Sequence, residues 1–170
     1  MRRTSAAVGS ALFFVLAPGV VAGLVPWLLT DWRLRGTGPA WLPLRVLGVL
    51  LVAAGSAVLV HAFARFVSEG LGTPAPPAPP QHLVVGGLYR HVRNPMYVAV
   101  VAIILGQALI LGAMVLVGYA VVVWAAVAGF VRWYEEPTLA RRFGAAYDTY
   151  RAAVPAWMPR WSPWEPGRRV

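Results

Sequence analysis

The sequence has no cysteine and no lysine, and it contains only six acidic residues. The absence of cysteine excludes a disulfide framework, a cysteine-ligated metal and a thiol nucleophile. Charged residues make up 12% of the 170 positions and hydrophobic residues 59%, which is far outside the range of soluble domains. A chain of this composition is expected to have the lipid bilayer as its solvent.

The net charge of +9 arises because fifteen arginines face those six acids. Most of the arginines flank apolar runs, whereas a nucleic-acid surface would show a basic stripe with interleaved aromatic residues. This distribution suits the anionic headgroups of membrane lipids, and no nucleic-acid partner is expected.

Two apolar stretches in the first half predict membrane spans. The first, residues 6–29, gives about 36 Å of helix, which exceeds a hydrocarbon core of about 30 Å. It is too long for a signal peptide, the alternative, and no convincing cleavage site ends it. A membrane helix can keep Pro18 and Pro26 if its neighbours satisfy the carbonyls that they free. The second span, residues 46–67, contains His61, which is either a functional group within the membrane or an interfacial residue bonded to a neighbouring helix.

The longest apolar stretch, residues 97–131, has about 35 residues and is too long for a single crossing. It predicts two short helices of about 15 to 18 residues each, joined by a tight turn near Leu111, Gly112 and Ala113. Glycines in this region predict close helix contact, the usual membrane substitute for a hydrophobic core. These glycines are Gly106, Gly112, Gly118 and Gly129.

Four spans would place both chain ends on one side of the membrane, together with all the arginines except Arg33, Arg35 and Arg45. Such an excess marks the cytoplasmic side. The predicted fold is an all-α integral membrane protein with about four transmembrane helices, including a short C-terminal helical hairpin, and a cytoplasmic amphipathic helix. A single structural domain would comprise two N-terminal spans over residues 1–67, a proline-rich linker over 68–80, and a C-terminal part over 81–170 that holds the hairpin and the last helix.

Two polar segments border the predicted hairpin. Residues 81–97 concentrate histidine, arginine, asparagine and tyrosine directly before a span, which indicates either a functional site or an interfacial belt. After the hairpin come Glu135 and Glu136, whose repulsion and desolvation predict a nearby cation, although acidity at a helix start is an alternative explanation. An apolar stripe for packing or lipid contact follows on one predicted helix, and its members are Leu139, Phe143, Tyr147, Tyr150 and Val154.

Ordered elements in both polar segments resemble a known family. They are QHLV at 81–84, GLY at 87–89, RNPMY at 93–97 and EEPTL at 135–139, followed by FG, Y-x-x-Y and VP in the family's order and spacing. This set resembles the isoprenylcysteine carboxyl methyltransferases and related bacterial membrane methyltransferases, which in turn resemble phospholipid N-methyltransferases.

The resemblance implies S-adenosylmethionine as the cofactor and no metal. It also implies that the cofactor pocket is lined by Gln81, His82, Leu83, Val84, Tyr89, Asn94, Pro95, Met96, Tyr97 and Glu135. Arg132 and Glu136 are the implied catalytic residues. Arg132 would address a carboxylate or phosphate of the acceptor, and either glutamate would take the cofactor's ammonium group. Asn94 and Gln81 stand where the family usually has histidine, which weakens any expectation of acid–base catalysis.

The implied function is methyl transfer to a lipophilic or lipid-modified acceptor that enters from the bilayer. The active site and both termini would lie on the cytoplasmic side of a bacterial-type plasma membrane. A prenylcysteine-like carboxylate is the first candidate acceptor, and a phospholipid or other lipid amine is the alternative. Further alternatives are a nicotinamide-dependent membrane reductase, for which no glycine-rich strand-to-helix motif is found, and a noncatalytic membrane scaffold.

Overall fold

The computed structural model describes residues 16–35, 38–70 and 82–165, and helices are the only regular elements among them. The beginning of the first predicted span, residues 71–80 of the predicted proline-rich linker, and Gln81 lie outside these residues. The first helical stretch, Leu16–Thr30, contains a π-helical turn, Val20–Leu24, and ends with α2, Val25–Thr30. A 3₁₀ turn, Pro39–Trp41, leads into α3, Leu42–Gly70.

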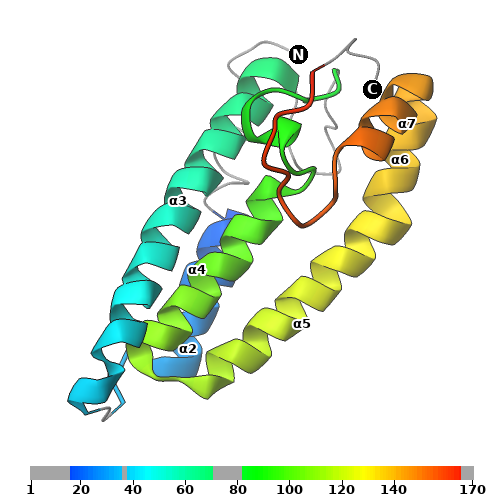
Figure 1. Ribbon diagram of the computed structural model, residues 1–170. Coiled ribbons are helices and arrows are strands. Elements are labelled where there is room, and N and C mark those ends of the chain that lie inside the picture. The colour runs from blue at the N-terminus through cyan, green and yellow to red at the C-terminus, as the bar shows by residue number, and fades with distance from the viewer. Residues whose placement is uncertain (1–15, 36–37, 71–81, 166–170) are drawn as a thin grey trace.

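The second half of the chain contains the predicted hairpin. Its elements are a 3₁₀ turn at Gly87–Arg90, α4 at Pro95–Leu111, α5 at Met114–Phe130, a π turn at Val131–Glu135, α6 at Glu136–Phe143 and α7 at Ala145–Ala153. α4 runs along α3 in the opposite direction, and α5 turns back and separates from α4 with distance from the turn (Figure 1). α6, α7 and the segment before α4 lie together at the open end of the hairpin, called here the polar end.

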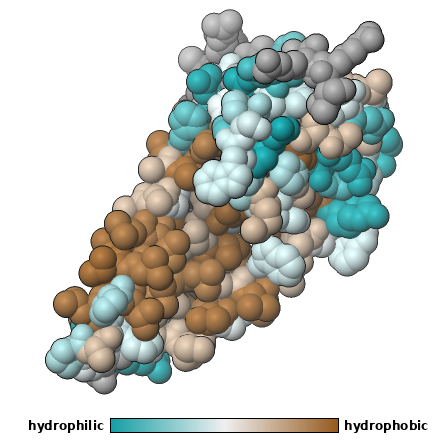
Figure 2. All heavy atoms as spheres, viewed as in Figure 1, coloured by the Kyte–Doolittle hydropathy of each residue, from teal (hydrophilic) through white to brown (hydrophobic). Residues whose placement is uncertain are grey.

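The distribution of side chains suits a membrane. Hydrophobic residues gather over the part of the visible face remote from α6 and α7, and hydrophilic residues gather at the polar end (Figure 2). The helical stretches Pro39–Arg65 and Met114–Phe143 are long and apolar enough to cross a membrane, and Leu16–Thr30 and Pro95–Leu111 are shorter apolar helices. The all-α membrane fold is thereby confirmed, whereas the number of four crossings stays a prediction.

The hairpin turn lies where the sequence predicts it. α4 ends at Leu111, and Gly112 takes a φ of +67°, a left-handed conformation in which glycine is unstrained. α4 and α5 each have 17 residues, within the predicted length, but α5 continues through the π turn into α6, so the second arm is one helical stretch over Met114–Phe143. The wider turn lets the helix pass Pro137, which has no N–H to donate, without ending.

The predicted apolar stripe after Glu136 falls on two helices, so the prediction of one helix is wrong. Gly144 separates α6 from α7 with φ +51° and ψ −131°, a conformation that side-chain-bearing residues avoid. The packing role itself is confirmed. Tyr147, Tyr150 and Val154 form a buried cluster, and Leu139 and Phe143 pack against it.

Pro26 is accommodated in the first helix as the sequence requires. The π turn before it leaves the carbonyls of Val21 and Ala22 without a backbone donor from the proline. Tyr119 Oη donates to the carbonyl oxygen of Val21 at 2.9 Å, and Gln107 Nε2 donates to that of Ala22 at 2.7 Å. Neighbouring helices thus supply the missing hydrogen bonds, which in an apolar solvent cannot come from water.

Glycines allow α3 and α4 to approach closely. A Cβ atom added to Gly48 would lie 2.6 Å from the carbonyl oxygen of Gly106, and one added to Gly106 would lie 2.7 Å from that of Gly48. The predicted contact role of Gly106 is therefore confirmed. The same role is wrong for Gly118, which is exposed and has nothing within 4 Å, and for Gly129, whose nearest neighbour is Trp133 one turn along its own helix.

We expect Gly48→Ala to lower the free energy of unfolding by about 1–3 kcal/mol, because the added methyl group must push α3 and α4 apart. Gly118→Ala, which adds the same group to an open helix surface, should be neutral or raise stability by up to about 1 kcal/mol. Thermal unfolding of both variants in one detergent measures the difference. A Gly48→Ala variant as stable as the wild type would refute the close contact.

Candidate functional site

A buried ion-pair cluster joins the segment before α4 to α6 and α7. Arg93 Nη1 lies 2.8 Å from Glu136 Oε1 and donates a hydrogen bond to Tyr147 Oη at 3.3 Å. Arg151 Nη2 lies 3.2 Å from the other carboxylate oxygen of Glu136. Glu136 is only 7% exposed, so both of its oxygens are paired away from bulk water. A cation was predicted beside the two glutamates, and two arginines, Arg93 and Arg151, provide it.

One polar atom of the cluster makes no hydrogen bond within the described part of the chain. Arg93 Nε is buried and has no hydrogen-bond partner among the described residues. Burial raises the pKa of the Tyr147 hydroxyl, and the negative charge of Glu136 raises it further, whereas Arg93 lowers it. Tyr147 therefore stays protonated at neutral pH and accepts from Arg93 as a neutral group. A buried guanidinium N–H without a partner is a suitable donor for an anionic ligand group.

Glu135 faces a different partner from Glu136. It is the last residue of the π turn, and Tyr97 Oη donates a hydrogen bond to its Oε2 at 3.2 Å. Tyr97 lies in the first turn of α4, two residues after the buried Pro95. Wide turns of this kind occur often at functional sites, because they redirect side chains that a regular α-helix would place elsewhere. The hydrogen bond joins the two arms of the hairpin near the polar end.

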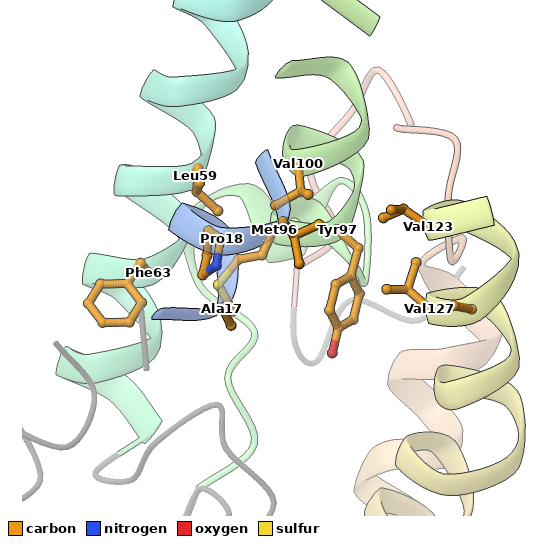
Figure 3. Close-up of a pocket in the computed structure, with 11 residues that line it drawn as sticks. Ala17, Pro18, Leu59, Phe63, Met96, Tyr97, Val100, Val123 and Val127 are labelled. Atoms are coloured by element: carbon orange, nitrogen blue, oxygen red, sulfur yellow. The ribbon is translucent and has the colours of Figure 1, made fainter. Parts of the chain in front are cut away.

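An apolar cavity of about 280 Å³ begins at the Tyr97 ring. Its lining residues come from the first helix, α3, α4 and α5, and they are Ala17, Pro18, Val21, Leu59, Phe63, Met96, Tyr97, Val100, Val123, Ala126 and Val127. In Figure 3, Met96, Tyr97 and Val100 face Val123 and Val127 across this space. Tyr97 is the residue that links the cavity to the acidic pair, because its ring lines the one and its hydroxyl contacts the other.

The first predicted cofactor block is largely a packing element. His82 is exposed, and Leu83 packs on the cluster formed by α7. Val84 points to a second cluster with Ala62 of α3 and Tyr89, and Met96 packs against it. Tyr150 Oη donates to the carbonyl oxygen of Tyr89 at 2.7 Å, which ties the block to α7. These contacts hold the block beside the start of α4, and its predicted role in cofactor binding stays a prediction.

The remaining predicted residues lie in three different environments. Asn94 is buried and its Nδ2 donates to the carbonyl oxygen of Ala156 at 3.1 Å, so the amide is already engaged by the chain. Glu136, predicted to be catalytic, is held by two arginines. Arg132 is exposed in the π turn. The structure thus brings together Tyr97 and Glu135 and keeps Arg132 at the surface.

Three residues of the cluster received no functional role from the sequence. Arg93 stands inside the RNPMY element, Tyr147 belongs to the apolar stripe, and Arg151 follows Tyr150 outside that stripe. The sequence feature that pointed to the cluster was the pair of adjacent glutamates, whose repulsion predicts a nearby cation. That feature does not show which arginine provides the charge.

The comparisons with known proteins bear on this arrangement. The family model of phospholipid methyltransferases matches residues 44–146, which is more than half of the chain. The chain belongs to the phospholipid methyltransferase family. No curated protein matches it. The family includes membrane methyltransferases related to the isoprenylcysteine enzymes, so the resemblance seen in the sequence is confirmed at the level of this wider family.

The part that matches the phospholipid methyltransferase family contains most of the polar end. Residues 44–146 run from the first turn of α3 to the beginning of α7 and include Arg93, Tyr97, Glu135 and Glu136. The first helix, which lines one side of the cavity, and residues 147–165, among them Arg151, lie outside the match. The chain is therefore a membrane methyltransferase of a lipid-directed family, and the acidic pair with Arg93 and Tyr97 belongs to the family's part of the fold.

Replacing Glu136 by Gln is expected to lower the free energy of unfolding by about 3 kcal/mol, because the buried Arg93 loses its ion-pair partner. Arg151→Gln should cost less than about 1 kcal/mol, because the Arg151 side chain is 43% exposed and water screens its charge. Denaturant unfolding of both variants in the same detergent measures the two losses. Losses of equal size would show that Glu136 is not anchored mainly by Arg93.

Proposed function

We propose that this chain transfers a methyl group from S-adenosylmethionine to a lipophilic acceptor whose apolar chain occupies the cavity between the helices. The observation that carries the proposal is the double contact of Tyr97, whose ring lines the apolar cavity and whose hydroxyl donates to Glu135. The apolar chain of the acceptor needs apolar surroundings and the charged cofactor needs polar ones, and these two environments meet at Tyr97.

The residues at the polar end fit the chemistry of S-adenosylmethionine. Glu135 accepts one hydrogen bond from Tyr97 and has carboxylate lone pairs left for an ammonium group. The free Nε–H of Arg93 suits a carboxylate. The ring of Tyr97 offers a π face to a sulfonium. When bound, the cofactor supplies an electrophilic methyl group on that sulfonium, and the chain's own residues contribute alignment and exclusion of water.

The acceptor's reactive group decides what else the site must do. A carboxylate, as in the prenylcysteine-like candidate, is already a nucleophile and needs no base. A lipid amine must lose a proton before it can attack the methyl group. The Tyr97–Glu135 pair borders the cavity and is the candidate acceptor of that proton. The family's name favours a phospholipid. Both acceptors belong to the same proposal, and an acceptor panel separates them.

The orientation belongs to the proposal as well. The polar end holds Arg90, Arg93, Arg141, Arg142 and Arg151, whereas Arg33, Arg35 and Arg45 lie near the hairpin turn, where the Arg35 N–H donates to the carbonyl of Leu111. The excess of arginine predicts that the polar end faces the cytoplasm, where the water-soluble cofactor is available. The lipophilic acceptor then reaches the cavity from the bilayer.

Binding of S-adenosylmethionine to the detergent-purified protein, measured by calorimetry, tests the cofactor. We expect micromolar affinity that weakens about tenfold in Glu135→Gln, equivalent to about 1.4 kcal/mol, because the ammonium loses its carboxylate. Asp148→Asn removes the same charge from an exposed position on α7 and should have no effect. Folded wild-type protein that binds no S-adenosylmethionine would disprove the proposal and favour the reductase or the scaffold.

Filling the cavity tests the acceptor. Val123→Phe places a ring in the space lined by Met96 and Tyr97, so kcat/KM for a long-chain lipid acceptor should fall at least about tenfold while the Kd of S-adenosylmethionine stays unchanged. Val122→Phe, at a neighbouring position that is 65% exposed, is the matched control. The acceptors to compare are a prenylated cysteine carboxylate and a phospholipid amine. Equal turnover by both variants would show that the acceptor does not use the cavity.

A further inference from the structure

The chain beyond α7 turns back and runs along the segment that precedes α4 (Figure 1). Residues 154–165 are called here the strap, and residues 90–94 the cofactor-side loop. Three backbone hydrogen bonds join them. The N–H of Arg93 donates to the carbonyl of Pro155 at 2.9 Å. In the other direction, the N–H of Arg160 donates to the carbonyl of His91 at 3.0 Å, and that of Trp164 donates to the carbonyl of Arg90 at 2.9 Å. Such pairing fixes the path of the loop without any regular sheet.

Side chains of the loop add three further contacts to the strap. Asn94 Nδ2 donates to the carbonyl of Ala156 at 3.1 Å, Arg90 Nε donates to that of Trp164 at 2.6 Å, and His91 Nδ1 lies 2.9 Å from that of Arg160. Two tryptophans fasten the strap to the rest of the fold. Trp157 contacts Trp124 of α5 edge-on at 6.4 Å between ring centres, and Trp164 contacts Tyr150 of α7 at 5.4 Å.

The loop that the strap holds carries the side chains of the proposed site. Arg93 lies within it and pairs with Glu136, and Asn94 is the last residue before the helix on which Tyr97 projects into the cavity. Asn94 makes no side-chain cap on α4, and its amide instead donates to the strap. The strap lies outside residues 44–146, the region that matches the family model, and supports a loop that lies inside it.

We infer that Asn94 is a positioning residue that acts through the strap: its amide holds residues 154–165 against the loop and so sets the positions of Arg93 and Tyr97. This inference rests on the proposed function for its consequence in cofactor binding. It assigns Asn94 a role different from the direct cofactor contact that the sequence resemblance implies. A histidine at this position can also donate an N–H, so either residue can serve the same contact.

A coupled-variant experiment on detergent-purified protein distinguishes the two roles. Asn94→Ala is made in the full chain and in a chain that ends after Pro155 and so lacks the Ala156 carbonyl, and the Kd of S-adenosylmethionine is measured in all four proteins. We expect Asn94→Ala to raise the Kd about fivefold in the full chain, the effect of one neutral hydrogen bond, and less than about twofold in the shortened chain. Asn94→His should restore affinity in the full chain only. A full fivefold effect in the shortened chain would establish direct contact and overturn the inference.

Hydrogen–deuterium exchange of the peptide covering residues 90–97, without ligand, keeps this test separate from the proposed function. Asn94→Ala and the shortened chain should both speed exchange there, and the turn at residues 111–114 should be unaffected. If the shortened chain does not fold, Trp157→Ala, which removes the contact with Trp124, replaces it. Unchanged exchange at 90–97 would overturn the inference even if the cofactor binds, whereas faster exchange without cofactor binding would support the strap and refute the proposed function.

Discussion

The buried ion pair between Arg93 and Glu136 is the interaction on which the polar end depends. Arg93 directly precedes the first arm of the hairpin and Glu136 lies in the second arm just beyond the π turn, so the pair ties the arms together at the end remote from Gly112. Desolvating two charges is costly unless further polar groups surround them, and Arg151 and Tyr147 provide these. The arms diverge from the turn toward the polar end, where side chains bridge them, and the apolar cavity lies between the diverging arms.

In two helices a π turn allows the helix to continue past a proline. A π turn ends two residues before Pro26 in the first helix and two residues before Pro137 in the second arm of the hairpin. In each case the residue before the proline donates its N–H five residues back, from Val25 to Val20 and from Glu136 to Val131. In the first helix, polar side chains of the hairpin satisfy the freed carbonyls. In the second, the wide turn carries Glu135 to Tyr97, so a solution to a backbone problem also builds the site.

Much of the fold follows from patterns with a direct physical cause. An apolar run of 35 residues is too long for a single helix across the membrane, so a turn at Gly112 was predictable. A cation beside two adjacent glutamates was predictable as well, because the two negative charges repel each other. The single helix predicted after Glu136 failed because Gly144 adopts a conformation that periodicity does not reveal. The roles expected for Gly118 and Gly129 failed because a glycine pattern does not show which helix lies opposite, and the contact is instead between Gly48 and Gly106.

The sequence by itself determined the solvent, the helical hairpin and the family, because these depend on hydrophobicity, length and the order of short motifs. Only the tertiary structure decided the partners. In the folded chain Glu136 pairs with Arg93 and Arg151, and Glu135 accepts a hydrogen bond from Tyr97. The strap lies against Asn94. Apart from the pair of Arg151 and Glu136 on successive helices, these pairings join residues 38 to 62 positions apart, and local patterns carry no information about which distant groups meet. They are fixed by how far the arms of the hairpin diverge and by where the chain returns, which are properties of packing.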